Sequence, residues 1–167
     1  MTVAMLLGDA FDRVVESADD VVAGLSVEQL THRPGQRGNS IAWLIWHLAR
    51  VQDDHVCDLA EREQAWTAEG WIDRFDLGLP PADTGFGHSS QQVSQVVADA
   101  ELLTGYLTVV TVRTKEYLGT LADEGYSRVI DTSWDPPVTL GVRLVSVVND
   151  ITQHVGQAAY VRGLLSD

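Results

Sequence analysis

IAWLIWHLARVQDDHVCDLAERE, residues 41–63, has the pattern of one long amphipathic helix. Asn39 or Ser40 precedes it and can cap its first turn. Its apolar side chains recur at the spacing of one helix face, at Ile41, Trp43, Leu44, Leu48, Val51 and Leu59. A helix of this kind has to bury its apolar face against other parts of the chain.

Three further segments predict helices that can cover that face. Residues 3–22 form the first, and residues 93–121 the third, although residues 89–101 could be a separate short helix. The last helix follows the cap Thr139 and runs to about Leu165, on the stripe Leu140, Leu144, Val148, Ile151, Val155 and Ala158. Four long helices without a convincing strand predict an all-α, antiparallel four-helix bundle, and the length suits one domain over residues 1–167.

The connections between these helices differ in length. Residues 26–39 are rich in turn formers and leave room for a turn of helix at 27–30. Residues 126–137 end in two prolines and are expected to be extended. Residues 67–90 predict a long ordered loop between the second and third helices, a candidate lid, anchored by the aromatic residues Trp71, Phe75 and Phe86.

Composition narrows the range of partners. The chain has 24 acidic and 11 basic residues, a formal charge of -13, and this charge disfavours nucleic acid and anionic membranes. No segment approaches the roughly 20 apolar residues that span a bilayer, and the N-terminus lacks the basic start of a signal peptide. Cys57 is the single cysteine, which excludes an internal disulfide and agrees with a cytoplasmic protein.

Three polar residues lie on faces that the helical pattern assigns to the core. His47 shares its face with Trp43, Leu44 and Val51. Asp150 and His154 are four residues apart, so their side chains converge beside the stripe of the last helix. A carboxylate buried without a partner costs several kcal/mol, and no Lys or Arg stands three or four positions from Asp150.

Two interpretations account for these residues. In the first, Asp150 and His154 form a structural ion pair, and His47 is a core histidine satisfied by one hydrogen bond. In the second, all three residues bind one divalent metal ion. Imidazole and carboxylate groups suit zinc and other first-row metals, and three protein ligands leave one position open for chemistry.

The second and fourth helices carry a resemblance to a known family. NSIAWLIWHLARVQDDH, residues 39–55, and NDITQHVGQAAYVRG, residues 149–163, resemble the DinB-like superfamily of metal-binding four-helix bundles. That superfamily includes mycothiol-dependent maleylpyruvate isomerases and mycothiol S-transferases. Many members have two histidines four apart in the last helix, whereas Asp150 takes the first place here, as in the isomerase-like subgroup. The resemblance implies His47, Asp150 and His154 as the metal ligands.

The resemblance also implies a reaction. A metal ion held by two neutral histidines and an aspartate deprotonates a coordinated thiol, which becomes a nucleophile at neutral pH. The expected protein is a metal-dependent S-transferase, with zinc as the expected metal, that joins a small thiol, mycothiol, to an electrophile. A metal-dependent hydrolase and a non-catalytic metal- or thiol-binding stress protein remain as alternatives.

Two further residues are candidates for the site. Asp54 lies seven positions after His47, nearly on the same face, and could assist catalysis or contact the thiol. Arg143 lies seven positions before Asp150 and could bind the co-substrate through a carboxylate. The family often forms dimers, so a homodimer is a further expectation.

Overall fold

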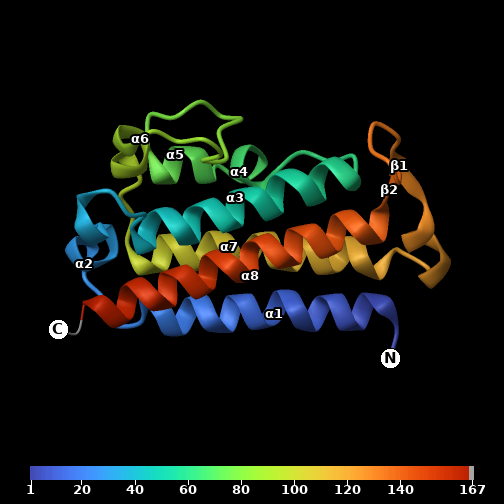
Figure 1. Cartoon of the computed structure of the whole chain (residues 1–167), viewed down its shortest axis with the longest axis horizontal. Helices are drawn as coiled ribbons and strands as arrows, with labels where there is room; N and C mark the ends of the chain where they lie inside the picture. Colours follow the sequence, from blue (N-terminus) through green and yellow to red (C-terminus); the bar gives the residue numbers. More distant parts are fainter. Residues whose placement is uncertain (166–167) are drawn as a thin grey trace.

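Four long helices pack side by side along most of the molecule (Figure 1). The computed structural model describes residues 1–165. The four helices are α1 (Val3–Val22), α3 (Ile41–Leu59), α7 (Ala100–Gly119) and α8 (Leu140–Leu164). Around the bundle, α1 packs against α7 and α8, and α3 packs against the same two helices from the other side. The predicted all-α bundle is confirmed.

The helices do not simply alternate in direction. In Figure 1, α1 and α8 run one way, and α3 and α7 run the other. The neighbours α1 and α7 are therefore antiparallel, as are α3 and α8, whereas α3 and α7 are parallel. The reason is the long connection after α3, which carries the chain back to the end of the bundle at which α3 begins. Adjacent parallel helices need a crossover of this length.

Short elements occupy the connections. The turn expected at residues 27–30 is α2, and the separate short helix considered before the third long helix is α6. The segment 126–137, expected to be extended, contributes β1 to a small antiparallel hairpin. These elements are α2 (Val27–Thr31), η1 (Pro34–Gln36), α4 (Ala65–Ala68), α5 (Trp71–Phe75), α6 (Ser90–Gln95), η2 (Asp123–Ser127), β1 (Val129–Asp131) and β2 (Val138–Thr139).

Side-chain caps fix where the long helices begin. Ser40, rather than Asn39, caps α3 by accepting a hydrogen bond from the backbone N–H of Trp43. Thr139 caps α8 as expected, through the N–H of Val142. These caps satisfy N–H groups that a helix leaves free in its first turn. They set the register in which His47, Asp150 and His154 face the interior.

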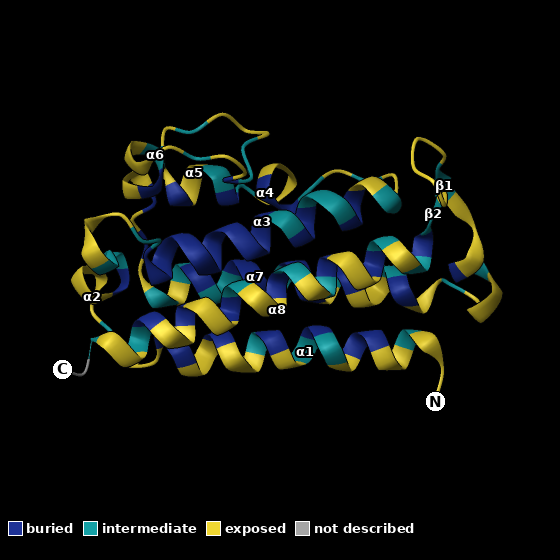
Figure 2. Ribbon diagram, in the orientation of Figure 1, coloured by how far each residue is buried: buried dark blue, intermediate teal, exposed yellow. Residues whose placement is uncertain are grey.

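The core lies between the four helices and extends under the long connection. The stripe predicted on α8 is buried except at Val148, because Val147 is the side chain that points inward there. The first half of α3 is buried on every side, as its dark blue ribbon in Figure 2 shows. The bundle covers one side of α3, and the connection between α3 and α7 covers the other.

The connection between α3 and α7 is ordered, as predicted, but not by all of its aromatic residues. Trp71 and Phe75 are buried beside Tyr106 of α7. Phe86 is 92% exposed and anchors nothing. Polar contacts hold that part of the loop instead, because the buried guanidinium of Arg50 donates hydrogen bonds to the backbone oxygens of Pro81 and Asp83.

Within residues 1–165, none of the helices has the length and apolar character needed to cross a membrane.

Candidate metal centre

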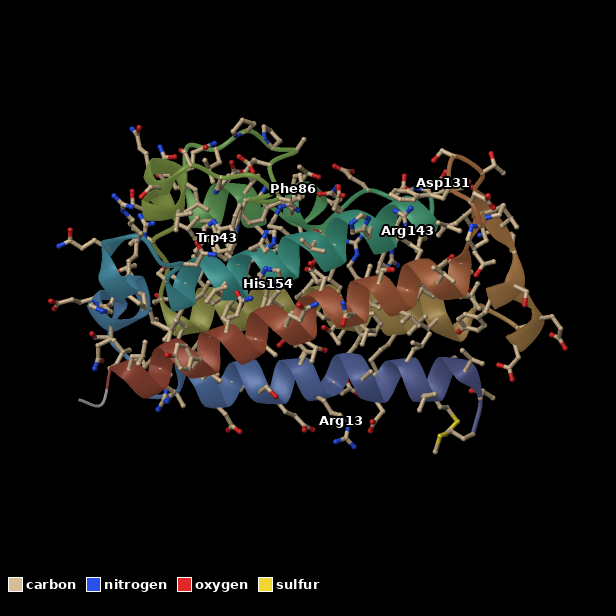
Figure 3. The ribbon with its side chains drawn as sticks, viewed as in Figure 1. Arg13, Trp43, Phe86, Asp131, Arg143 and His154 are labelled. Carbon is tan, nitrogen blue, oxygen red and sulfur yellow. The ribbon has the colours of Figure 1, made fainter. Side chains whose placement is uncertain are left out.

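His47, Asp150 and His154 meet between α3 and α8. One potential ligand atom from each residue lies within 4.8 Å of those of the other two. The rings of His47 and His154 have centroids 4.6 Å apart and are nearly perpendicular, at 75°. Figure 3 shows His154 pointing from α8 toward α3. The register of two separate helices therefore brings the three residues predicted from the sequence to one point.

Hydrogen bonds to backbone oxygens orient both histidines. Nδ1 of His47 lies against the carbonyl oxygen of Thr84, in the long connection. Nδ1 of His154 lies 2.9 Å from the carbonyl oxygen of Asp150. A carbonyl oxygen only accepts hydrogen bonds, so each Nδ1 carries a proton and each neutral ring keeps its lone pair on Nε2. Metal-bound histidines are usually fixed in this way.

The pKa values of the two histidines shift in opposite directions. Burial lowers the pKa of His47, so this ring is neutral at neutral pH. The contact with the Asp150 side chain raises the pKa of His154, and the same contact lowers the pKa of Asp150. Asp150 is therefore a carboxylate at neutral pH. The cluster combines an anion with one ring that is already neutral.

Asp150 has an oxygen that the described protein leaves unsatisfied. Its Oδ2 is buried and has no hydrogen-bond partner among residues 1–165. Nδ1 of His154 is 3.3 Å away, but its hydrogen bond goes to the backbone oxygen of Asp150. A buried carboxylate oxygen without a donor costs free energy. Such an atom, in a cluster with two imidazoles, fits the ligand set of a divalent metal ion.

The long connection closes over His47 with backbone atoms. Gly85 has a φ of +90°, and a Cβ at this position would lie 2.9 Å from Nδ1 of His47 and 2.9 Å from a ring carbon of Trp46. Trp43 stacks on the His47 ring with centroids 4.6 Å apart. The glycine is thus required both by its backbone conformation and by the close approach. Together these groups shield one side of His47 from solvent.

His88 holds this part of the connection in place. Its Nε2 lies 2.9 Å from a carboxylate oxygen of Asp83, and its Nδ1 accepts a hydrogen bond from the indole N–H of Trp43. The hydroxyl of Ser89, not His88, caps α6. His88 therefore acts through packing and hydrogen bonds, and it supports the residues that surround His47.

A second polar cluster lies further along α3, and sequence reasoning missed it. Asp53 is 1% exposed and accepts hydrogen bonds from the backbone N–H groups of Ala65 and Trp66 and from the hydroxyl of Tyr106. Arg50, fully buried, lies 3.7 Å from Asp53 and also donates to Tyr106. The sequence did offer one signal of this cluster, because Arg50 and Asp53 are charged residues three positions apart in a largely apolar helix. Its partners lie in α4 and α7, far away in sequence.

An open pocket adjoins the metal cluster at Asp150. Its volume is about 460 Å³, within the range of small-molecule sites. Arg143 lines this pocket together with Asp150, and its guanidinium lies 3.5 Å from the carboxylate of Asp131 in β1 (Figure 3). The other lining residues are Val51, His55, Trp134, Val138, Val142, Ser146 and Val147. The structure thus places Arg143 beside the cluster, where the sequence put it.

Asp54 is not brought to the same place. Its Oδ1 accepts a hydrogen bond of 2.7 Å from the amide of Gln64, just beyond the end of α3. It is not one of the residues that line the pocket next to Asp150. The catalytic role expected for Asp54 stays a prediction, and no step below depends on it.

The fold and this cluster define a class of protein. A four-helix bundle with two histidines and an aspartate converging between α3 and α8 is a DinB-like protein. A sequence model described as Mycothiol-S-transferase matches residues 6–167, and the chain belongs to this family.

A solved structure supports the assignment of the fold. The chain is similar to a conserved protein from Enterococcus faecalis whose crystal structure is known, with 36% sequence identity and a TM-score of 0.90. The alignment covers 97% of this chain and 96% of that one. No curated protein sequence matches the chain.

Proposed function

We propose that this protein is a metal-dependent thiol S-transferase. His47, Asp150 and His154 would hold one divalent ion, most simply zinc, and mycothiol would be the thiol. The observation that carries the proposal is the buried Oδ2 of Asp150, which makes no hydrogen bond among the described residues, in a residue whose carboxylate lies within 4.8 Å of a ring nitrogen of both His47 and His154. Membership of the mycothiol S-transferase family supports the thiol and the type of reaction.

The donor set fits such an ion. Two neutral imidazoles and one carboxylate leave a net charge of +1 on a divalent ion and an open coordination position. An ion of this kind lowers the pKa of a bound thiol, so that the sulfur is a thiolate at neutral pH. The alternative from the sequence is an ion pair between Asp150 and His154, whose Nδ1 lies 3.3 Å from Oδ2. The contact of Nδ1 with the backbone oxygen of Asp150 is shorter, at 2.9 Å, and this favours the metal site over the ion pair.

Residues around His47 hold its ring in position. Thr84 fixes the His47 ring through its backbone oxygen, and Gly85 and Trp43 keep water from one side of that ring. The open pocket reaches the cluster at Asp150 and gives the acceptor room to approach from there. In the reaction, the sulfur forms a bond to an electrophilic carbon, the leaving group departs with its electron pair, and the thiol proton passes to solvent.

The experiment is a conjugation assay with zinc-loaded protein, mycothiol and monobromobimane. We expect turnover above the uncatalysed rate, lost on chelation and in His154→Ala. The exposed histidine of the α2 C-terminus, His32, supplies a matched control, because His32→Ala removes an imidazole far from the cluster. Metal-loaded protein that fails to accelerate the reaction with mycothiol, bacillithiol and glutathione alike would overturn the proposal.

A hydrolase is the competing function, and one observation favours it. His55 lines the same pocket as Asp150 and is a possible general base for a water molecule. The two functions differ in their response to His55→Ala. A transferase that uses a preformed thiolate should keep most of its activity, whereas a hydrolase that uses His55 should lose roughly 100-fold or more.

A further inference from the structure

The lining of the pocket beside Asp150 is chemically mixed. An apolar wall comes from α3, α8 and the hairpin, through Val51, Val138, Val142, Val147 and Trp134. The indole of Trp134 is 66% exposed although it lines a pocket. Arg143 lines the same pocket from α8, one helical turn before Val147. A flat apolar group could lie against the apolar wall with a polar end at Arg143.

Arg143 has binding capacity that the described protein does not use. Arg50, Arg33 and Arg162 all donate hydrogen bonds to backbone oxygens and so tie parts of the fold together. Arg143 donates none to any residue in the range 1–165, although a guanidinium has five N–H donors. Its contact with Asp131 is a single ion pair of 3.5 Å, longer than the 2.7–2.9 Å typical of charge-assisted hydrogen bonds.

The charge of Arg143 is unusual in its surroundings. The protein has a formal charge of -13, which repels anions from most of its surface. Among the residues that line the pocket, Arg143 carries the fixed positive charge, and its side chain is 29% exposed. The carboxylate of Asp150 lines the same pocket, so an anion is expected at Arg143 and away from Asp150. A partly desolvated guanidinium with free donors binds carboxylate and sulfonate groups in a fork geometry.

We infer that this pocket binds the acceptor substrate and selects acceptors that combine a flat apolar body with an anionic group. Trp134 and the valines pack on the body, and Arg143 binds the anion after exchanging its weak contact with Asp131. The assignment of the ligand as the acceptor rests on the proposed S-transferase function. The preference of the pocket for an apolar anion rests only on the geometry of Arg143 and its neighbours.

Binding can be measured without any reaction. The probes are p-toluenesulfonate and methyl p-tolyl sulfone, which differ in replacing one charged oxygen by a methyl group. Chelator-treated protein removes any contribution from a metal ion, and ligand-observed NMR titration suits weak binding. We expect the sulfonate to bind about tenfold more tightly, the size of one charge-assisted hydrogen bond. Equal binding of the two probes would overturn the inference.

Two substitutions separate anion binding from a structural role of the ion pair. Arg143→Gln should reduce the preference for the sulfonate to near parity. Asp131→Asn removes the competing carboxylate and should tighten sulfonate binding severalfold, while leaving the sulfone unchanged. If the pair only holds the hairpin to α8, both variants should weaken binding of both probes, and the inference is then wrong.

Further variants test charge and packing separately. Arg13→Gln removes the same charge on the outer side of α1, far from Arg143 in Figure 3, and should leave the preference intact. Trp134→Ala should weaken the sulfonate and the sulfone equally, because the aromatic wall contacts the shared ring. Unchanged binding of both probes in Trp134→Ala would show that the apolar wall is assigned wrongly.

Turnover distinguishes this inference from the function on which it rests. The acceptors are 4-(chloromethyl)benzenesulfonate and 4-(methylsulfonyl)benzyl chloride, and the reaction forms a carbon–sulfur bond with loss of chloride. We expect Arg143→Gln to lower kcat/KM for the sulfonate about tenfold relative to the sulfone. Turnover of both acceptors with no effect of Arg143→Gln on their ratio would reject the pocket and keep the transferase. An Arg143-dependent binding preference without turnover would keep the pocket and reject the transferase.

Discussion

Two polar clusters include residues of α3, and each holds one aspartate, but the two differ in completeness. Asp53 receives two backbone N–H groups and the Tyr106 hydroxyl, with Arg50 beside it, and it is satisfied within the protein. Asp150, opposite His47 and beside a pocket, keeps a buried oxygen without a donor in the described chain. Buried polar groups that stabilise a fold normally have all their hydrogen-bond partners within the protein, as Asp53 does. We call the Asp53 cluster the closed cluster, and the cluster of His47, Asp150 and His154 the open cluster. A buried group without a partner beside a pocket indicates a ligand from outside.

The largest expected effect concerns stability. Asp53→Ala leaves the guanidinium of Arg50 buried without its carboxylate, and we expect a loss of about 3–5 kcal/mol in the free energy of unfolding. Asp150→Ala in chelated protein should cost less than about 1 kcal/mol, because it removes an oxygen that already lacks a partner. Urea unfolding followed by circular dichroism measures both. Equal losses would mean that the two carboxylates have the same structural role.

Zinc should narrow the difference in stability between the Asp53→Ala and Asp150→Ala variants, because only Asp150→Ala loses the stabilisation that zinc gives the parent. Binding to the folded state alone stabilises it by about 2.7 kcal/mol at a metal concentration 100 times Kd. The parent protein should therefore gain thermal stability with zinc, and His47→Ala and Asp150→Ala should not. Tyr106→Phe perturbs only the closed cluster and should keep the gain. A similar zinc-induced shift in His47→Ala and in the parent would count against the cluster as the binding site.

Gly85 connects the loop to the open cluster. Gly85→Ala forces a Cβ against His47 and Trp46 at a φ of +90° and should weaken zinc binding about 10- to 100-fold by displacing the support of His47. Gly87→Ala is the matched control, because Gly87 also has a positive φ, +73°, but its Cβ would meet open space. It should cost about 1 kcal/mol in stability and leave zinc affinity unchanged. Calorimetric titration of zinc compares the two variants.

The smallest effect is a pH dependence of the loop. Burial acts to raise the pKa of Asp83, but hydrogen bonds with His88 and the N–H of Gly85 outweigh it, and the pKa is lowered overall. A lowered pKa in the folded state adds stability above the unfolded value, near 3.9, and this stability is lost as the pH falls through the folded value. Asp83→Asn should therefore destabilise the protein slightly at pH 7, by less than about 1 kcal/mol, and this difference should shrink as the pH falls below the unfolded value. A difference that stays constant over the whole acid range would exclude this carboxylate as its cause.

The sequence predicts the open cluster better than the closed one. His47, Asp150 and His154 stand out because they interrupt apolar faces, and their spacing places them on neighbouring turns. The partners of Asp53 are backbone groups of α4 and a tyrosine of α7, which no local pattern links to it. The burial of the first half of α3 on every side also escaped prediction, because part of its cover comes from an irregular connection. Helical periodicity reports one buried face, not what packs on the other.

The pocket beside Asp150 could be predicted in part. Arg143 could be placed near Asp150 by helical spacing, but Asp131 and Trp134 reach it only through the hairpin between η2 and α8. That hairpin was expected only as an extended segment. Its strands β1 and β2 have only three and two residues, too few to show an alternating pattern, so the wall that the hairpin forms could not be derived from the sequence alone.

Metal stoichiometry tests the central claim most directly. Tag-free parent protein, His154→Ala and His32→Ala would be purified together, loaded with zinc, passed through a desalting column and measured by elemental analysis. We predict about one equivalent of zinc in the parent and in His32→Ala, and almost none in His154→Ala. The absence of zinc from all three proteins, or an equal content in His154→Ala and the parent, would contradict the account.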